Sequence, residues 1–216
     1  MRELINKKAE DYAAKFSSKE DELLAEIAAY TNQNHPHAKM LSGHVQGKIL
    51  EIVSCLLKPK NILEIGTFTG YSALCLAKGL QPGGKLHTIE LRKEDADIAA
   101  SFFSKSLQKN KIVLHVGNAL EIITTLDEKW DIVFIDADKV SYIDYYELTL
   151  PNVNQNGLII ADNVLFHGEV LEENRKGKNA KAIDAFNSHV ANDKRVEQVM
   201  LTVRDGLILI RKIVVS

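Results

Sequence analysis

The sequence predicts a doubly wound α/β fold with a mostly parallel, seven-stranded sheet. From residue 61 onward, short apolar runs alternate with helix-like stretches, and these runs are apolar almost throughout. Strands buried on both faces have this composition, and the helices between them act as the crossovers of a parallel sheet. Near the C-terminus, Arg204-Asp205-Gly206 separates two β-rich runs, and Asp-Gly in that position indicates a hairpin. We therefore expect the sheet to end in an antiparallel hairpin.

The stretch before residue 61 is predicted to be helical. Ser18-Lys-Glu-Asp21 resembles a capping box, and apolar residues follow at positions 23, 24, 27 and 28. A polar loop at 31–37 interrupts the pattern, and an amphipathic segment then runs from about residue 47 to Lys58-Pro59. Because no linker separates these helices from the sheet, we predict a single domain. Residues 1–58 would cap the ligand edge of a core formed by residues 59–216.

Strands and helices alternate along the predicted core. The predicted strands are Asn61–Ile65, Lys85–Ile89, Ile112–Val116, Ile132–Ile135, Leu158–Ala161, Val196–Val203 and Leu207–Ile213. The predicted helices are Tyr71–Leu80, Glu94–Leu107, Ala119–Leu126, Tyr142–Leu150 and Ala180–Ala191. The last two strands form the expected hairpin.

The composition is that of an ordinary globular chain. Its 216 residues are 45% apolar and 26% charged, and the net charge of −2 gives no global basic field for nucleic acid. Two cysteines are too few for a disulfide framework or a cysteine-rich zinc site. The charged N-terminus lacks a signal-peptide core, and no apolar run reaches membrane-spanning length. We therefore expect a cytoplasmic protein with no membrane partner.

Polar side chains follow two of the predicted strands directly. Asp136-Ala-Asp-Lys139 comes after the fourth strand, and Asp162-Asn163 comes after the fifth. In an open α/β sheet the ligand crevice lies outside the carboxyl ends of the strands, so these side chains should converge. Oxygen ligands of this kind suit Mg²⁺, and the amine of Lys139 beside them suits a general base. Taken singly, each aspartate is more often a helix cap and the lysine a surface residue; their convergence favours a site.

A glycine turn follows the first predicted strand. Glu64-Ile-Gly66-Thr-Phe-Thr-Gly70 has the spacing G-x-x-x-G rather than the G-x-G-x-x-G of dinucleotide-binding proteins. The carboxylate of Glu64 would repel a pyrophosphate but attract a cationic amino group. Glu90 ends the second strand, 24 positions after Gly66, near the spacing at which an acidic residue binds ribose hydroxyls. A nucleoside joined to a positively charged amino acid describes S-adenosylmethionine.

These motifs together resemble the cation-dependent class I O-methyltransferases, the caffeoyl-CoA and catechol O-methyltransferase-like enzymes. The resemblance rests on residues 64–72, on 136–139 with Tyr142 and Tyr145, on 162–163, and on Met40-Leu-Ser-Gly43 with Gln46-Gly47. It covers about residues 35–213. It implies a Rossmann-like methyltransferase fold, S-adenosylmethionine as cofactor, a divalent cation and a homodimer.

Carried over by position, the resemblance implies a set of site residues. The implied cofactor-binding residues are Met40, Ser42, Glu64, Gly66, Thr67, Ser72, Glu90, Leu91, Ala119 and Asp136. Asp136, Asp162 and Asn163 would bind Mg²⁺, or another divalent cation such as Mn²⁺ or Ca²⁺. The sequence departs from the family at Asn118, where an aspartate is frequent, and at Leu165, where an aromatic residue is frequent.

The chemistry expected at this site is an in-line methyl transfer that depends on positioning and charge control. A bound cation would lower the pKa of the acceptor hydroxyl, and Lys139, with its own pKa lowered by that cation, would take the proton. Lys139 and Asp136 are thus the expected catalytic residues. His35, His37, His44 and His167 are assigned no catalytic role.

Several alternatives remain open from the sequence. The acceptor is either a small phenolic or catechol-like molecule or a 5-hydroxyuridine in tRNA, for which modest lysine and arginine clusters leave room. A nicotinamide-dependent oxidoreductase is disfavoured by the missing third glycine and by Glu64. A non-catalytic binding module would not need the predicted metal ligands.

Overall fold

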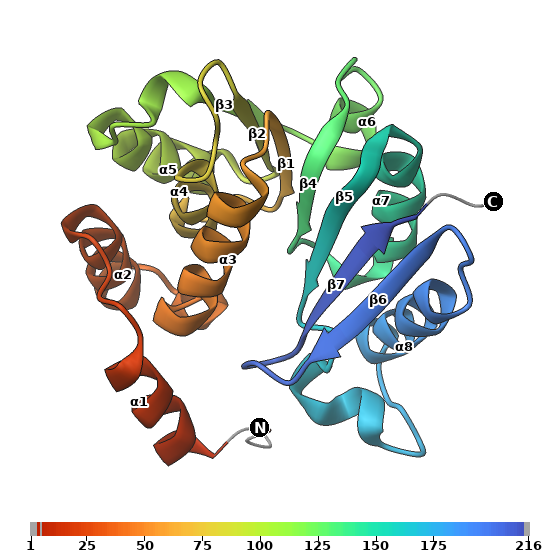
Figure 1. Ribbon diagram of the computed structural model, residues 1–216. Coiled ribbons are helices and arrows are strands. Elements are labelled where there is room, and N and C mark those ends of the chain that lie inside the picture. The colour runs from red at the N-terminus through yellow and green to blue at the C-terminus, as the bar shows by residue number, and fades with distance from the viewer. Residues whose placement is uncertain (1–3, 5, 214–216) are drawn as a thin grey trace.

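The computed structural model describes residue 4 and residues 6–213, and one sheet runs through it in the order β3-β2-β1-β4-β5-β7-β6 (Figure 1). The ends of the predicted cap and core, residues 1–3, 5 and 214–216, lie outside the described residues. The strands are β1 (Asn61–Ile65), β2 (Lys85–Glu90), β3 (Ile112–Val116), β4 (Trp130–Ile135), β5 (Val153–Asp162), β6 (Val196–Leu201) and β7 (Leu207–Lys212).

The first five strands are parallel and the last two form an antiparallel hairpin. β1 pairs with both β2 and β4, so the strand order reverses between β1 and β4. β7 is antiparallel to β5 and to β6, which confirms the predicted hairpin. In sheets of this type the ligand site lies at the carboxyl ends of the strands where the order reverses. The ends of β1 and β4 therefore mark where a functional site is expected.

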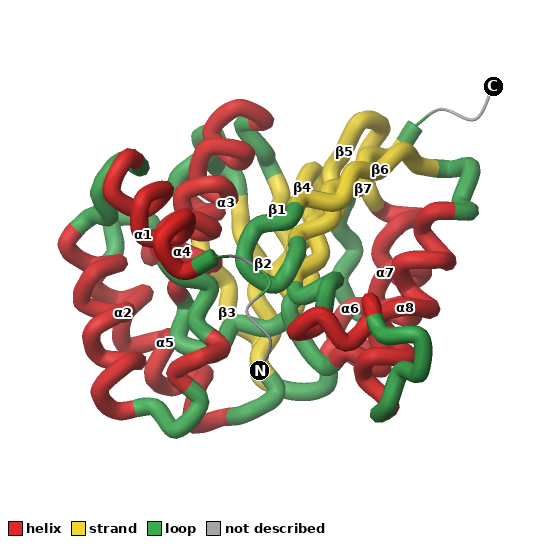
Figure 2. The backbone as a smooth tube through the Cα atoms, turned by 90° about the horizontal axis from the view of Figure 1, so that it is seen from below, coloured by secondary structure: helices red, strands yellow, loops and turns green. Residues whose placement is uncertain are grey.

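Helices cover both faces of the sheet, and Figure 2 shows the strands as a layer between the two groups. Side chains from alternate positions of each central strand enter different cores: Ile132 and Phe134 of β4 pack on one side, Val133 and Ile135 on the other. This explains why the strands are apolar throughout. The first group of helices is α2 (Glu22–Asn34), α3 (His44–Leu57), α4 (Tyr71–Ala77) and α5 (Lys93–Lys105). The second group is α6 (Ala119–Ile123), α7 (Tyr142–Thr149) and α8 (Lys178–Ala191).

The N-terminal helices differ from the expectation in two places. α1 (Lys7–Phe16) and α2 are separate, and the N-cap of α2 is Asp21, whose side chain accepts a hydrogen bond from the Leu24 amide at 2.9 Å. The capping box beginning at Ser18 was therefore wrong. α2 also continues to Asn34, into the expected loop, because Thr31 is fully buried there and donates to Thr69 Oγ1 at 3.0 Å.

Element boundaries in the core differ by a few residues. β5 begins at Val153 rather than Leu158, since Val153 pairs with Trp130 across an irregularity in the β4–β5 ladder. α4 ends at Ala77, three residues before the predicted end. No helix in the described part of the chain is both long and apolar enough to cross a membrane.

We expect Gly79→Ala to destabilise the fold. A Cβ at Gly79 would lie 2.1 Å from the carbonyl carbon of Ser54, because α3 crosses the end of α4 in direct backbone contact. Overpacking of this kind costs roughly 1–3 kcal/mol, which a shift in the urea unfolding midpoint would report. Ala100→Ser, on the exposed surface of α5, is the control and should change stability by less than about 0.5 kcal/mol. A Gly79→Ala protein as stable as its parent would contradict this close approach.

Candidate active site

The carboxyl ends of β1 and β4 meet at Gly66. Asp136 donates its backbone N–H to the Ile65 carbonyl at 2.9 Å, which continues the ladder past both strands. Gly66 has φ +101°, and a Cβ there would lie 2.0 Å from the Asp136 carbonyl oxygen. Only glycine satisfies both the backbone conformation and this approach. The glycine turn predicted from the sequence thus brings β1 directly against the segment that carries Asp136.

A cavity of about 540 Å³ lies over this junction. Nine of the ten residues predicted to bind a cofactor line it: Met40, Ser42, Gly66, Thr67, Ser72, Glu90, Leu91, Ala119 and Asp136. They come from five different parts of the chain, so the fold brings them together as the motifs had suggested. Asn118, the departure from the family pattern, also lines the cavity and caps α6 by accepting from the Leu120 amide.

Glu90 presents a fixed carboxylate to this cavity. Its Oε2 accepts from the Phe68 amide at 2.7 Å and its Oε1 accepts from the Arg92 amide at 2.9 Å. The residue is only 6% exposed. Two backbone donors therefore hold the carboxylate in one orientation, and the remaining lone pairs can accept from a ligand.

Glu64 is the predicted cofactor residue that does not line the cavity. It is fully buried beneath the turn, where its Oε2 accepts from Thr88 Oγ1 at 2.5 Å, while Oε1 has no hydrogen-bond partner among the described residues. Burial raises the pKa of Glu64 to about 8. Glu64 is consequently protonated in this arrangement over most of the neutral range, rather than the free carboxylate that the sequence suggested.

A second cavity of about 950 Å³ adjoins the first, and both are lined by Met40, Asp136, Ala137 and Asp138. The predicted metal ligands Asp136, Asp162 and Asn163 line this second cavity together with Lys139. The two strand ends therefore converge as predicted.

Gln46 is a member of this site that sequence reasoning left without a role. It lies in the first turn of α3, is 1% exposed, and donates from Nε2 to Asp162 Oδ2 at 2.6 Å. The Asn163 amide donates to the other oxygen of Asp162, also at 2.6 Å. Burial and the neighbouring Asp136 raise the pKa of Asp162 to about 7. The available signal was that Gln46 belongs to the Gln46-Gly47 pair, one of the motifs that carry the family resemblance.

Lys139 faces Asp136 and Tyr142. Its Nζ lies 3.0 Å from Asp136 Oδ1 and donates to the Tyr142 hydroxyl at 2.7 Å, and that hydroxyl donates to the Asp162 carbonyl at 3.0 Å. Burial disfavours the charged amine, but Tyr142 and Asp136 outweigh it, so the pKa of Lys139 is raised above its ordinary value. In this arrangement Lys139 is an ammonium group, the opposite of the lowered pKa expected beside a cation.

The histidines singled out in the sequence lie in different places. His44 bonds to the Ser18 carbonyl at 2.7 Å, and His35 pairs with Asp95. His167 lines the second cavity and lies 3.4 Å from Asp205. Asp138 accepts from Tyr145 and from Ser141, so it orients α7.

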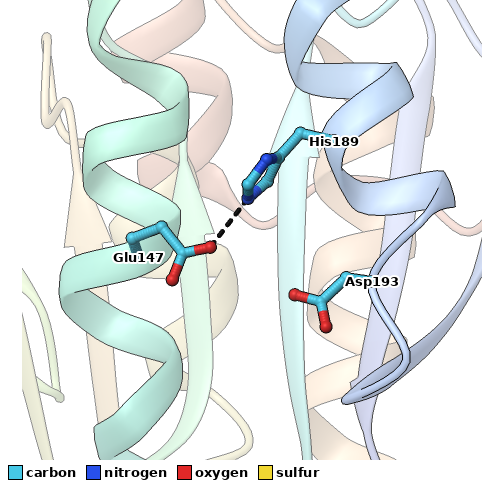
Figure 3. A group of neighbouring side chains, drawn as sticks. All are labelled: Glu147, His189 and Asp193. Atoms are coloured by element: carbon cyan, nitrogen blue, oxygen red, sulfur yellow. Dashed lines mark hydrogen bonds and ion pairs between the residues drawn. The ribbon is translucent and has the colours of Figure 1, made fainter.

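A separate group of possible metal-binding side chains joins α7 to α8: Glu147, His189 and Asp193 (Figure 3). His189 bonds to Glu147 at 2.7 Å, and Arg195 Nη2 lies 2.7 Å from Glu147 and 2.6 Å from Asp193. Arg195 holds the pKa of Asp193 down at about 2. The guanidinium already supplies the positive charge that a cation would bring, so the group is explained as an ion-pair network.

The strand order and the two joined cavities define a doubly wound α/β protein with its ligand site at the point where the strand order reverses. The O-methyltransferase family profile matches residues 14–213. The chain therefore belongs to the O-methyltransferase family, which confirms the family, fold class and enzyme class predicted from the sequence.

Individual relatives agree with this assignment. A probable caffeoyl-CoA O-methyltransferase of Dictyostelium discoideum is 32% identical over 209 residues, covering 94% of this chain and 91% of that one. A catechol O-methyltransferase of Niastella koreensis is 33% identical over 160 residues, 72% of each chain. The crystal structure of the O-methyltransferase TomG from Streptomyces achromogenes, solved with S-adenosylmethionine, superposes with a TM-score of 0.86 at 30% identity, covering 96% of each chain.

We expect Glu64→Gln to stabilise the cofactor-free protein increasingly as pH rises. The pKa of Glu64 is about 8 in the folded protein and 4.5 in its ordinary, solvent-exposed state. Between these two values the folded protein keeps a proton that the unfolded chain has released. The parent therefore loses stability as pH rises through this window, while glutamine cannot ionise. Thermal unfolding at pH 5 to 8 would measure the difference, each kcal/mol moving Tm by roughly 2–4 °C.

The exposed substitution Glu94→Gln controls for the change in net charge. A difference between parent and Glu64→Gln that stayed constant across this pH range would contradict the burial argument.

Proposed function

We propose that this protein is an S-adenosylmethionine- and Mg²⁺-dependent O-methyltransferase acting on a catechol-like or phenolic hydroxyl. One observation carries the proposal: a cavity suited to a nucleoside cofactor and a cavity lined by oxygen ligands share Asp136. A methyl donor in the first cavity and an acceptor in the second would meet at that residue.

The cofactor assignment is supported by the fit of the first cavity. Glu90 offers a fixed carboxylate for ribose hydroxyls, and the apolar side chains of Met40 and Leu91 line the same cavity. Glu64 is buried with a raised pKa, and its Oε1 has no hydrogen-bond partner among the described residues. A cationic amino group of the cofactor close to Glu64 would stabilise the ionised carboxylate. The S-adenosylmethionine bound to TomG supports the same cofactor. When bound, it would supply an activated methyl group. Thr67, Ser72 and Ala119 complete the proposed contacts.

The donor set at the second cavity fits a hard divalent cation. Asp136 raises the pKa of the buried Asp162, which means that the two negative charges repel each other. A cation held by Asp136, Asp162 and Asn163 would relieve that repulsion. When bound, it would lower the pKa of an acceptor hydroxyl and, by neutralising Asp136, that of Lys139. Mn²⁺ or Ca²⁺ would suit the same ligands.

Lys139 is proposed as the general base. Tyr142 holds Nζ at 2.7 Å, and Tyr142 is itself anchored to the Asp162 backbone, so the amine is positioned relative to both strand ends. The ion pair with Asp136 stabilises the protonated amine of Lys139. Lys139 can act as a base only when Asp136 no longer stabilises this protonated form.

A small acceptor is favoured over tRNA. Part of the basic clustering seen in the sequence is neutralised locally, since Lys105 pairs with Glu26 and Arg175 with Asp184. The catechol O-methyltransferase of Niastella koreensis supports a catechol-like acceptor. A tRNA 5-hydroxyuridine remains the alternative, since Lys39, Lys178 and Arg204 line the second cavity.

Two further features are proposed with the function. A homodimer would bury apolar side chains that are exposed on α1 and α3, Tyr12, Phe16, Ile52 and Leu56 among them. A cytoplasmic location is consistent with two free cysteines, one of them exposed.

We expect methylation of a catechol panel to need both the cation and its ligands. Treatment with a chelator, or the substitution Asp162→Asn, should lower the rate by at least about 100-fold, measured as S-adenosylhomocysteine formed. Asp144→Asn, on the exposed face of α7, is the matched control. tRNA lacking its natural modification is assayed in parallel. Equal rates in chelated and Mg²⁺-loaded samples would refute the metal role, and turnover of tRNA alone would refute the catechol acceptor.

We expect Lys139→Met to lower the rate at pH 7 by about 100-fold or more, because a positioned base is lost. The rate should recover partly toward pH 9, where hydroxide can replace the amine. The pH–rate profile on the best acceptor of the panel measures both effects, with the exposed Lys181→Met as control. Full activity of Lys139→Met at pH 7 would exclude the base role.

A further inference from the structure

The segment between α2 and α3 is tied to α5 through a buried histidine. The His35 side chain is 8% exposed, and its Nε2 lies 2.8 Å from Asp95 Oδ1. Nδ1 of the same ring accepts from the His37 amide at 3.1 Å. A ring nitrogen that accepts cannot carry the proton, so Nε2–H is the donor to Asp95. The segment held in this way continues to Met40 and Ser42, which line the first cavity.

Asp95 uses its second oxygen for another residue of that cavity. Asp95 lies in the first turn of α5, is 4% exposed, and its Oδ2 lies 2.5 Å from Arg92 Nη2. Each carboxylate oxygen therefore faces one cationic or N–H partner. The His35 contact is a hydrogen bond, whereas the Arg92 contact is an ion pair in which Oδ2 has no hydrogen-bond partner among the described residues.

Both partners of Asp95 contact the ring of Phe68. His35 meets this ring edge-on, with centroids 4.5 Å apart and planes at 84°, and the Arg92 guanidinium lies 6.0 Å from the ring centroid. Phe68 has φ +51°, a left-handed conformation that aromatic residues seldom adopt. The surrounding contacts must hold it there.

The backbone of Phe68 and that of Arg92 are the two donors that fix Glu90. The Phe68 amide donates to Oε2 and the Arg92 amide to Oε1. A displacement of either residue would move or release the carboxylate. Phe68, Glu90 and Arg92 all line the first cavity, whereas Asp95 and His35 do not.

We infer that Asp95 is a positioning residue for cofactor binding: through His35, Arg92 and Phe68 it holds the Glu90 carboxylate in the orientation that accepts the ribose hydroxyls. The inference rests on the proposed function, because Glu90 has to be the ribose-binding group. His35, which has no role in the proposed chemistry, would then help to position Glu90. The affinity for the cofactor would depend on Asp95, a carboxylate that lies outside the cavity.

The test is the affinity for S-adenosylhomocysteine, measured by isothermal titration calorimetry. Asp95→Asn keeps the size of the side chain but places an amide where one charged oxygen had been. We expect the affinity to fall about tenfold, the size of one lost charge-assisted bond. Asp97→Asn is the matched control. It lies on the same helix, 65% exposed and paired only with Lys93 in the described part of the chain, and should bind as the parent does.

A double-mutant cycle separates positioning from a general loss of structure. If Asp95 acts through Glu90, Asp95→Asn should cause little further loss in a Glu90→Gln background. Phe68→Leu, which removes the ring that transmits the contact, should reproduce the roughly tenfold loss and likewise be non-additive with Glu90→Gln. It also provides the test if Asp95→Asn does not fold.

Each outcome decides between the two claims. Parent-like affinity in Asp95→Asn, or losses that add fully to those of Glu90→Gln, would overturn the inference while leaving the cofactor assignment intact. Failure of the parent protein itself to bind S-adenosylhomocysteine would overturn the proposed function and this inference together.

Discussion

The structure depends on the close backbone contact between the ends of β1 and β4. The Gly66 α-carbon faces the Asp136 carbonyl with no room for a Cβ, while the Asp136 amide pairs with Ile65. This contact lies where the strand order reverses. At that point the connections from β1 and β4 lead to helices on opposite faces of the sheet, which leaves a crevice between them. The contact also makes Asp136 common to both cavities. The two cavities thereby meet at a residue whose position is set by the backbone, and Met40, Ala137 and Asp138 line both cavities beside it.

Around this contact the fold buries ionisable groups whose charges are incompletely balanced. Glu64 and Asp162 both have raised pKa values, caused first by burial, and each also feels the charge of Asp136. Such burial costs stability unless a partner compensates it. Asp193 is the contrast, because Arg195 neutralises it and lowers its pKa. Among the described residues, the carboxylates with raised pKa values lie at the second cavity and beneath the glycine turn, and strongly shifted groups of this kind tend to cluster at functional sites.

Short apolar runs were enough to predict the strands because they alternate with longer helix-like stretches, as expected of strands buried on both faces of a parallel sheet. The convergence of the carboxylates at the ends of β4 and β5 could also be predicted from the sequence. The carboxyl ends of parallel strands lie at one edge of the sheet, whatever the strand order. Boundaries were less secure. Asp21 rather than Ser18 caps α2, because both are good caps and only the packing of Leu24 and Thr31 sets where the helix begins and ends. β5 extends back to Val153 through a pairing irregularity that leaves no mark on the sequence.

The sequence by itself determined the fold class, the strand ends that carry oxygen-bearing side chains and the glycine turn, because each depends on local composition or on spacing within one segment. Only the tertiary structure decided which groups are charged and which distant side chains support them. Glu64 became a buried neutral acid, Gln46 became a donor to Asp162 across 116 positions, and Asp95 came to face His35 across 60. Burial and long-range hydrogen bonding depend on how separate helices pack on the sheet, and no local pattern of residues records that packing.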